Sequence, residues 1–172
     1  MLRILALAGL AAVTFAVGGL GSGSVSLRPD FSRAALTSLG QEYEQLQQWA
    51  AAIAATTDTM PTGSSEGARV LADQLAHLML PLEEDFENTT AALSTAQLEL
   101  VLPLWERMAF AHAGFVMLQE EAAALGGDPA MEPFELHELV GELSAVLEFA
   151  AEMQRQILNQ LNTPAPTSIR IS

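Results

Sequence analysis

At 172 residues, the chain is long enough for one folded domain with an extension at each end. It contains seven Arg and no Lys against twenty-one Asp and Glu, which gives a formal net charge of −14. A surface this acidic repels phosphate backbones and anionic headgroups, so we expect neither nucleic-acid binding nor electrostatic attachment to a membrane surface. Cysteine is absent, which excludes disulfides, thiolate metal sites and covalent haem attachment.

An apolar segment without charged residues follows Arg3 and runs from Ile4 to Leu20. As a helix, its seventeen residues would reach about 25 Å, close to the roughly 30 Å hydrocarbon thickness of a bilayer. We expect residues 1–27 to form a retained membrane anchor with a Gly/Ser junction; the alternative is a signal peptide that is cleaved. The side chains that define the expected anchor are Ile4, Leu5, Leu7, Leu10, Val13, Phe15 and Val17.

The charges on either side of this segment predict its orientation. Arg3 and the amino terminus precede it, and the acidic remainder of the chain follows it. Because positively charged flanks tend to stay in the cytoplasm, we expect a single-pass protein of the bacterial inner membrane whose main domain is periplasmic. Arg28 and Arg33, which follow the segment, oppose this tendency.

A first helix is expected from about Phe31 to Thr57, with Asp30 as its N-cap. It should end before the turn-forming residues 58–64. Its apolar side chains recur at helical spacing. They are Leu36, Leu39, Tyr43, Leu46, Trp49 or Ala50, and Ile53.

A second helix is expected from about Ser65 to Leu80. Pro81 should bend or end it, because proline lacks the amide hydrogen and clashes with the preceding turn. An acidic run at residues 83–87 follows. The apolar side of this helix is expected to contain Val70, Leu71, Leu75, Leu78 and Met79.

A third helix should begin at a capping box formed by Ser94 and Gln97 and continue to about Leu125. Pro103 lies in its first turns and should bend it. The sequence at 126–129, Gly-Gly-Asp-Pro, is a strong signal for the end of a helix and a turn.

A fourth helix is expected from about Pro133 to Leu161, followed by an extended tail at residues 163–172. Its apolar residues are spaced by threes and fours, as in a helix that packs between neighbours at a shallow angle. They are Leu136, Leu139, Leu143, Val146, Ala150, Met153 and Ile157. No segment alternates with a period of two, so the sequence predicts an all-α protein with an antiparallel four-helix bundle at residues 28–162.

One histidine, His112, lies within the apolar stretch 108–118. In a bundle it could be an axial haem ligand, opposite His77, Met79 or Met153. The interpretation that we favour is a core or interface histidine on a stripe with Trp105, Met108 and Phe115. We therefore expect no cofactor.

The sequence offers little for metal binding or catalysis. No Glu or Asp lies three residues before a histidine, as di-iron bundles require, and the acidic run at 83–87 suggests at most a divalent-cation site. There is no nucleophile elbow, and the absence of Lys excludes a phosphate-binding loop that ends in Gly-Lys. We expect the protein not to be an enzyme.

The third helix carries more apolar residues than one buried stripe needs. A second line of Leu104, Ala111, Leu118 and Leu125 recurs every seven residues, with Phe110 and Met117 beside it. The helix is therefore either central in the bundle or presents apolar surface to another protein. The candidate partner interface comprises Leu104, Phe110, Met117 and Leu118, with Trp49 of the first helix.

These features together predict a non-catalytic accessory subunit that docks onto an integral membrane protein complex. Its anchor would contact the lipid bilayer, and respiratory or photosynthetic assemblies are hosts of this kind by analogy. The acidic face could also attract a basic soluble electron carrier such as a c-type cytochrome. The alternative is a secreted periplasmic bundle that binds a small ligand, haem or metal; an enzyme of unknown type is a third possibility.

Overall fold

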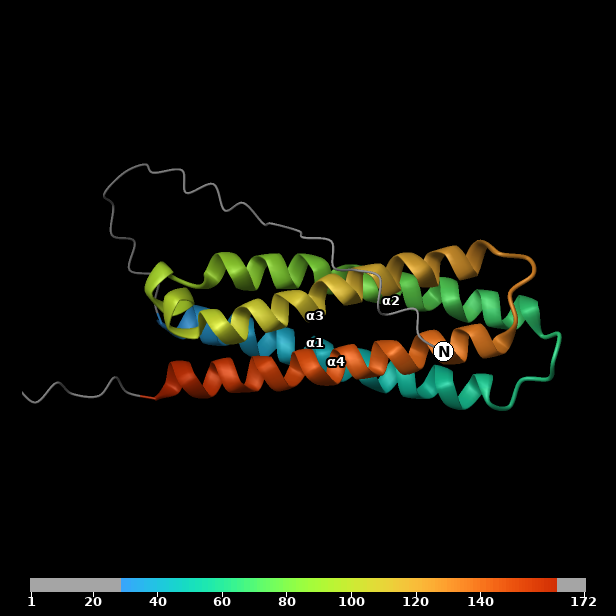
Figure 1. Ribbon diagram of the computed structural model, residues 1–172, viewed down its shortest axis with the longest axis horizontal. Coiled ribbons are helices and arrows are strands. Elements are labelled where there is room, and N and C mark those ends of the chain that lie inside the picture. The colour runs from blue at the N-terminus through green and yellow to red at the C-terminus, as the bar shows by residue number, and fades with distance from the viewer. Residues whose placement is uncertain (1–28, 164–172) are drawn as a thin grey trace, which may run out of the picture.

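The computed structural model describes residues 29–163, which fold into four α-helices without a β-strand (Figure 1). The helices are α1 (Pro29–Thr57), α2 (Ser65–Ala92), α3 (Thr95–Gly127) and α4 (Pro133–Asn162). The prediction of an all-α antiparallel four-helix bundle is confirmed. The expected anchor at residues 1–27 and the tail beyond Thr163 lie outside the described residues.

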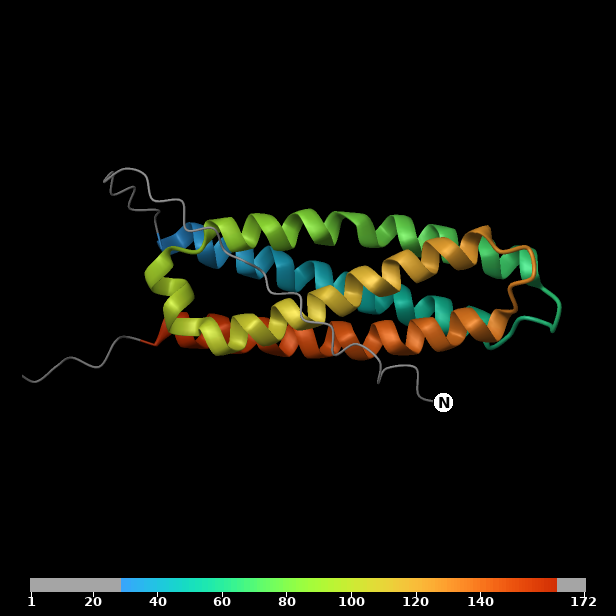
Figure 2. The ribbon, with the colours of Figure 1, turned by 45° about the horizontal axis from the view of Figure 1, so that its top comes forward.

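Each helix packs mainly against two neighbours in the bundle. α1 packs against α2 and α4, and α3 packs against the same two helices (Figures 1 and 2). α2 also touches α4 across the centre, whereas the backbones of α1 and α3 do not pack against each other within residues 29–163. At one end of the bundle, the Ser32 Oγ of α1 donates a 3.1 Å hydrogen bond to the Gln97 Oε1 of α3. Because α1 and α3 are diagonally opposite, a surface on the outside of one is separate from a surface on the outside of the other.

The buried faces of α1 and α4 match the predicted ones closely. All the expected α1 positions are buried, with Ala50 inside and Trp49 half-exposed. Six of the seven expected α4 positions are also buried: Leu136, Leu139, Leu143, Ala150, Met153 and Ile157. α1 begins at Pro29, so Asp30 lies within the helix and the prediction that it is the N-cap is wrong.

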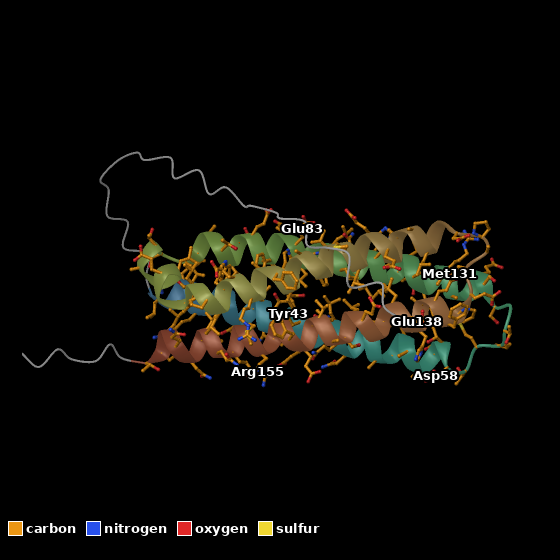
Figure 3. All side chains as sticks on the ribbon, in the orientation of Figure 1. Tyr43, Asp58, Glu83, Met131, Glu138 and Arg155 are labelled. Carbon is orange, nitrogen blue, oxygen red and sulfur yellow. The ribbon has the colours of Figure 1, made fainter. Side chains whose placement is uncertain are left out.

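α2 continues through Pro81 to Ala92, twelve residues beyond the predicted end at Leu80. Proline removes one backbone hydrogen bond and crowds the preceding turn. The residues after Pro81 offset this loss of stability, because the apolar side chains of Leu82 and Phe86 are buried against the rest of the core. Three of the acidic side chains that follow Pro81 are exposed on the outside of the same helix, as Figure 3 shows for Glu83, and Asp85 is half-buried.

The buried face of α2 also differs from the prediction. Leu75 and Met79 are buried as expected, but Val70 and Leu78 are 52% and 38% exposed. The core positions are instead filled by small side chains, Ala68, Ala72 and Ala76. The small alanine side chains share the buried face of α2 with large ones such as Leu75 and Met79.

The start of α3 is fixed by the predicted capping box. The Ser94 Oγ accepts a hydrogen bond from the Gln97 N–H at 3.3 Å, and the Gln97 Oε1 accepts one from the Ser94 N–H at 2.9 Å. α3 continues past Pro103. Its first turns, yellow-green in Figure 2, run at an angle to the rest of the helix, as a proline near the start would cause.

Tyr43 lies inside the bundle (Figure 3) and is only 1% exposed. Its hydroxyl has no hydrogen-bond partner among residues 29–163, and burial raises the pKa of the phenol above its ordinary value. A buried hydroxyl without a partner costs free energy that an apolar ring of the same shape does not.

We expect Tyr43→Phe to raise the free energy of unfolding by about 1 kcal/mol, because the ring packing is kept and the unpaired hydroxyl is removed. Urea denaturation followed by circular dichroism measures this change. A decrease in the free energy of unfolding by a similar amount would show that the hydroxyl is hydrogen-bonded in solution and would contradict the prediction.

Within residues 29–163, no helix combines the length and the apolar content that crossing a membrane requires.

Candidate functional site

The outward face of α3 carries the most exposed large apolar side chain of the described residues. Phe110 is 78% exposed, and Met117, seven residues later, is 49% exposed. Seven residues are nearly two helical turns, so both side chains lie on the same outward face. The opposite face of α3 is buried and contains Val101, Trp105, Met108, Ala111, Phe115, Leu118 and Ala122.

The structure separates the five predicted interface residues into three groups. Phe110 and Met117 are exposed together on α3, whereas Leu118 is buried in the core and Leu104 is partly buried against it. Trp49 is 46% exposed but lies on α1, whose backbone does not pack against α3. The line that contains Leu104 and Leu118 therefore packs in the core. Of the predicted interface residues on α3, only Phe110 and Met117 are exposed and accessible to a partner.

α4 extends this apolar surface. The guanidinium carbon of Arg107 lies over the Phe149 ring at 5.3 Å from its centroid, and Phe149 is 36% exposed. Gly114 faces Val146, since a Cβ at Gly114 would be 3.9 Å from the Val146 Cγ2. Arg107 and Gly114 lie one turn on either side of Phe110 along α3. We call the set Phe110, Gly114, Met117, Val146 and Phe149 the α3–α4 patch.

Sequence reasoning missed the α4 part of this patch. Val146 was predicted as a core position, but it is half-buried at the α3 contact. Phe149, three residues later, lies further toward the outside of α4. A large aromatic just outside a core seam is the only signal that the sequence contains, and the neighbouring helix cannot be identified from it.

His112 lies in a groove between α2 and α3. Its ring stacks on Phe86 with 4.0 Å between centroids and 7° between planes, and Phe115 lies on the same helix at 5.9 Å. The groove is also lined by Glu83 and Glu87, one turn apart on α2. The Nδ1 atom of His112 is buried and has no hydrogen-bond partner among the described residues. Burial lowers the pKa of His112 to about 4, so the ring is neutral at neutral pH.

The other predicted haem ligands are not positioned with His112. His77 is exposed on α2, with its Nδ1 2.7 Å from the Asp73 carbonyl oxygen of its own helix. It precedes Phe86, the stacking partner of His112, by nine residues, or about 13 Å along the helix axis. Met79 and Met153 are buried in the apolar core. His112 thus matches the core or interface histidine that the sequence favours, and His77 does not lie opposite it.

No group of three His, Asp or Glu side chains between residues 29 and 163 is arranged to hold a metal ion. The adjacent carboxylates of the run at 83–87 point in different directions around α2: Asp85 is half-buried, whereas Glu83, Glu84 and Glu87 are exposed.

The negative charge of the bundle is almost uncompensated. All the Asp and Glu residues of the chain lie within residues 29–163, together with four arginines. Arg33 and Arg69 donate to backbone carbonyls of Leu161 and Gly126, and Arg107 lies over Phe149. Of the four arginines in the described residues, only Arg155 forms an ion pair with a carboxylate, Glu152 at 3.0 Å. The surface is therefore suited to a positively charged partner.

Comparisons of the chain with models of protein families, with curated proteins and with solved structures found no match.

Proposed function

We propose that this protein is a non-catalytic accessory subunit of an integral membrane complex in the bacterial inner membrane. In this proposal the segment at residues 1–27 remains in the lipid bilayer, and the bundle docks onto the complex on the periplasmic side. Respiratory and photosynthetic complexes are the hosts that we infer by analogy. A basic soluble electron carrier is a further partner that the acidic surface could attract.

The observation that carries the proposal is the α3–α4 patch. Phe110 is 78% exposed on a helix whose core-facing residues are already buried. An exposed apolar surface rimmed by charged residues marks interaction sites in many soluble domains. Large aromatic side chains at such positions are frequent anchors of binding energy.

Native membranes provide the direct test of this function. Membranes that contain the full-length chain are washed with alkaline carbonate, solubilised with a mild detergent and separated by native electrophoresis. We expect the chain to stay with the washed membranes and to co-migrate with a larger complex. A detergent-free, soluble product that begins near Ser22 would overturn the anchored-subunit proposal.

A second candidate function is a secreted bundle that binds a small ligand or haem, and the groove at His112 supports it. Its buried Nδ1 atom has no partner in the described residues, and the aromatic stack with Phe86 forms one wall of the groove. Titration of the purified protein with haem tests this function by absorbance. The absence of a shifted visible band in both the oxidised and the reduced form would exclude haem binding at His112.

A further inference from the structure

We propose that the α3–α4 patch binds an amphipathic helix of a partner protein whose apolar stripe is bordered by Arg or Lys residues. This inference rests on the proposed function only in that it requires a partner at this surface. It adds the chemistry of that partner, namely a helix with positive charges at both ends of a short apolar stripe.

The apolar part of the patch fits a helix. Phe110 and Met117 are two turns apart on α3, about 10 Å along its axis. Val146 and Phe149 border the same surface from α4, and Gly114 between Phe110 and Met117 contributes no side chain. A shallow apolar surface between two antiparallel helices, with anchors two turns apart, is the kind of site in which an amphipathic helix buries its apolar face.

The border of the patch is negative at both ends. Glu106 lies one turn before Phe110, and Glu120 and Glu121 lie one turn after Met117; all three are exposed. Glu142 is exposed on α4, one turn before Val146. From Glu106 to Glu120 the distance along α3 is about 21 Å, or four turns of a partner helix.

Charge also decides between the three occupants that an apolar surface could have. A second copy of this chain would bring a second acidic border against the first, and anionic lipid would be repelled in the same way. Among residues 29–163, the only positive side chain at the patch is Arg107, which lies over the Phe149 ring. A helix with Arg or Lys beside its apolar residues satisfies both the apolar and the charged part of the surface.

Photo-crosslinking from position 110 tests the inference. Phe110→p-benzoylphenylalanine is introduced into the full-length chain, native membranes are irradiated, and the crosslinked segment is identified by mass spectrometry. Phe31→p-benzoylphenylalanine is the matched control, because Phe31 is 60% exposed on α1, whose backbone does not pack against α3. We expect crosslinks from position 110 to a segment with helical apolar spacing and at least two Arg or Lys, and none to that segment from position 31.

A charge variant adds a second measurement. Glu106→Gln combined with Glu120→Gln should reduce the crosslink yield from position 110 about fivefold at low salt, because complementary charge raises the rate of encounter. Both positions are exposed, so circular dichroism and the midpoint of thermal unfolding should be unchanged. An unchanged yield would overturn the charged part of the inference.

The remaining outcomes distinguish this inference from the proposed function. Crosslinks from position 110 only to lipid, to a second copy of this chain or to a segment without Arg and Lys would overturn the inference. So would equal yields from positions 110 and 31. A crosslink to a basic helix of a soluble protein, in a chain that carbonate extracts from membranes, would support the inference and overturn the anchored-subunit function. Co-migration with a membrane complex without such a crosslink would support the anchored-subunit function and overturn the inference.

Discussion

Gly40→Ala is expected to lower the free energy of unfolding by about 2 kcal/mol, although alanine is normally the better helix former by about 1 kcal/mol. Gly40 lies inside α1, where the buried side chain of Gln154 from α4 reaches it. A Cβ at Gly40 would be 2.6 Å from the Gln154 Nε2 and 2.8 Å from its Cδ. These separations are too short for non-bonded atoms, so the amide would have to move.

The Gln154 side chain cannot move without cost. It is 4% exposed, and its Nε2 donates a 2.6 Å hydrogen bond to the Leu36 carbonyl oxygen. Displacing it leaves a buried amide without its partner, which costs about 1–3 kcal/mol. For a domain of this size, the net loss corresponds to a fall in Tm of about 5–8 °C.

Two control variants make this prediction specific. Gly141→Ala replaces an exposed glycine of α4 that has no atom near the added Cβ, so it should raise the free energy of unfolding by about 0.5–1 kcal/mol. In a Gln154→Ala background, Gly40→Ala should cost little, because the colliding amide is gone. Urea denaturation of the four variants and the wild type gives all the values. Equal effects of Gly40→Ala and Gly141→Ala would contradict the proposed collision.

His112 is expected to make the stability of the bundle dependent on pH between about 4 and 6.5. Burial lowers the pKa of His112 from 6.5 in the unfolded chain to about 4 in the folded protein. Between these values the unfolded chain binds a proton that the folded protein does not, so stability rises with pH across this window. The contribution is complete above pH 6.5 and is lost progressively as the pH falls toward 4.

The expected size is smaller than the pKa difference alone suggests. The full difference would correspond to about 3 kcal/mol. Because part of the ring is accessible to solvent, we expect about 1–2 kcal/mol. This is the loss that the wild type should show, between pH 7 and pH 4, relative to a variant without an ionisable ring at this position.

His112→Phe is the variant that tests this prediction, because it can retain the stack with Phe86. The difference in the free energy of unfolding between it and the wild type is measured by urea denaturation from pH 4 to pH 7. Glu83 and Glu87, which line the same groove, are present in both proteins. His112→Leu loses the stack but should show the same change in pH dependence. A difference that does not vary with pH would rule out protonation of His112 as the cause.

Local signals in the sequence determined much of the fold. The core seams of α1 and α4, the Ser94 capping box and the turns around Gly63 and Gly126 were predictable. Each depends on residues within a few positions of one another, so the physics that produces it is contained in a short segment. The acidic character of the surface follows from composition alone.

Tertiary packing decided the features that depend on neighbouring helices. α2 continues past Pro81 because Leu82 and Phe86 find buried positions against the rest of the core, and that gain is invisible in the local sequence. Packing also placed three alanines, and not Val70 and Leu78, beside Leu75 and Met79 on the inner face of α2.

The candidate site was decided in the same way. Only the arrangement of the helices places Phe149 against Arg107, puts Trp49 on a different face, and sets Gln154 against Gly40. These contacts join residues far apart in the chain. A helical repeat predicts which side of a helix is apolar, but the free energy of packing two helices together decides which residues meet.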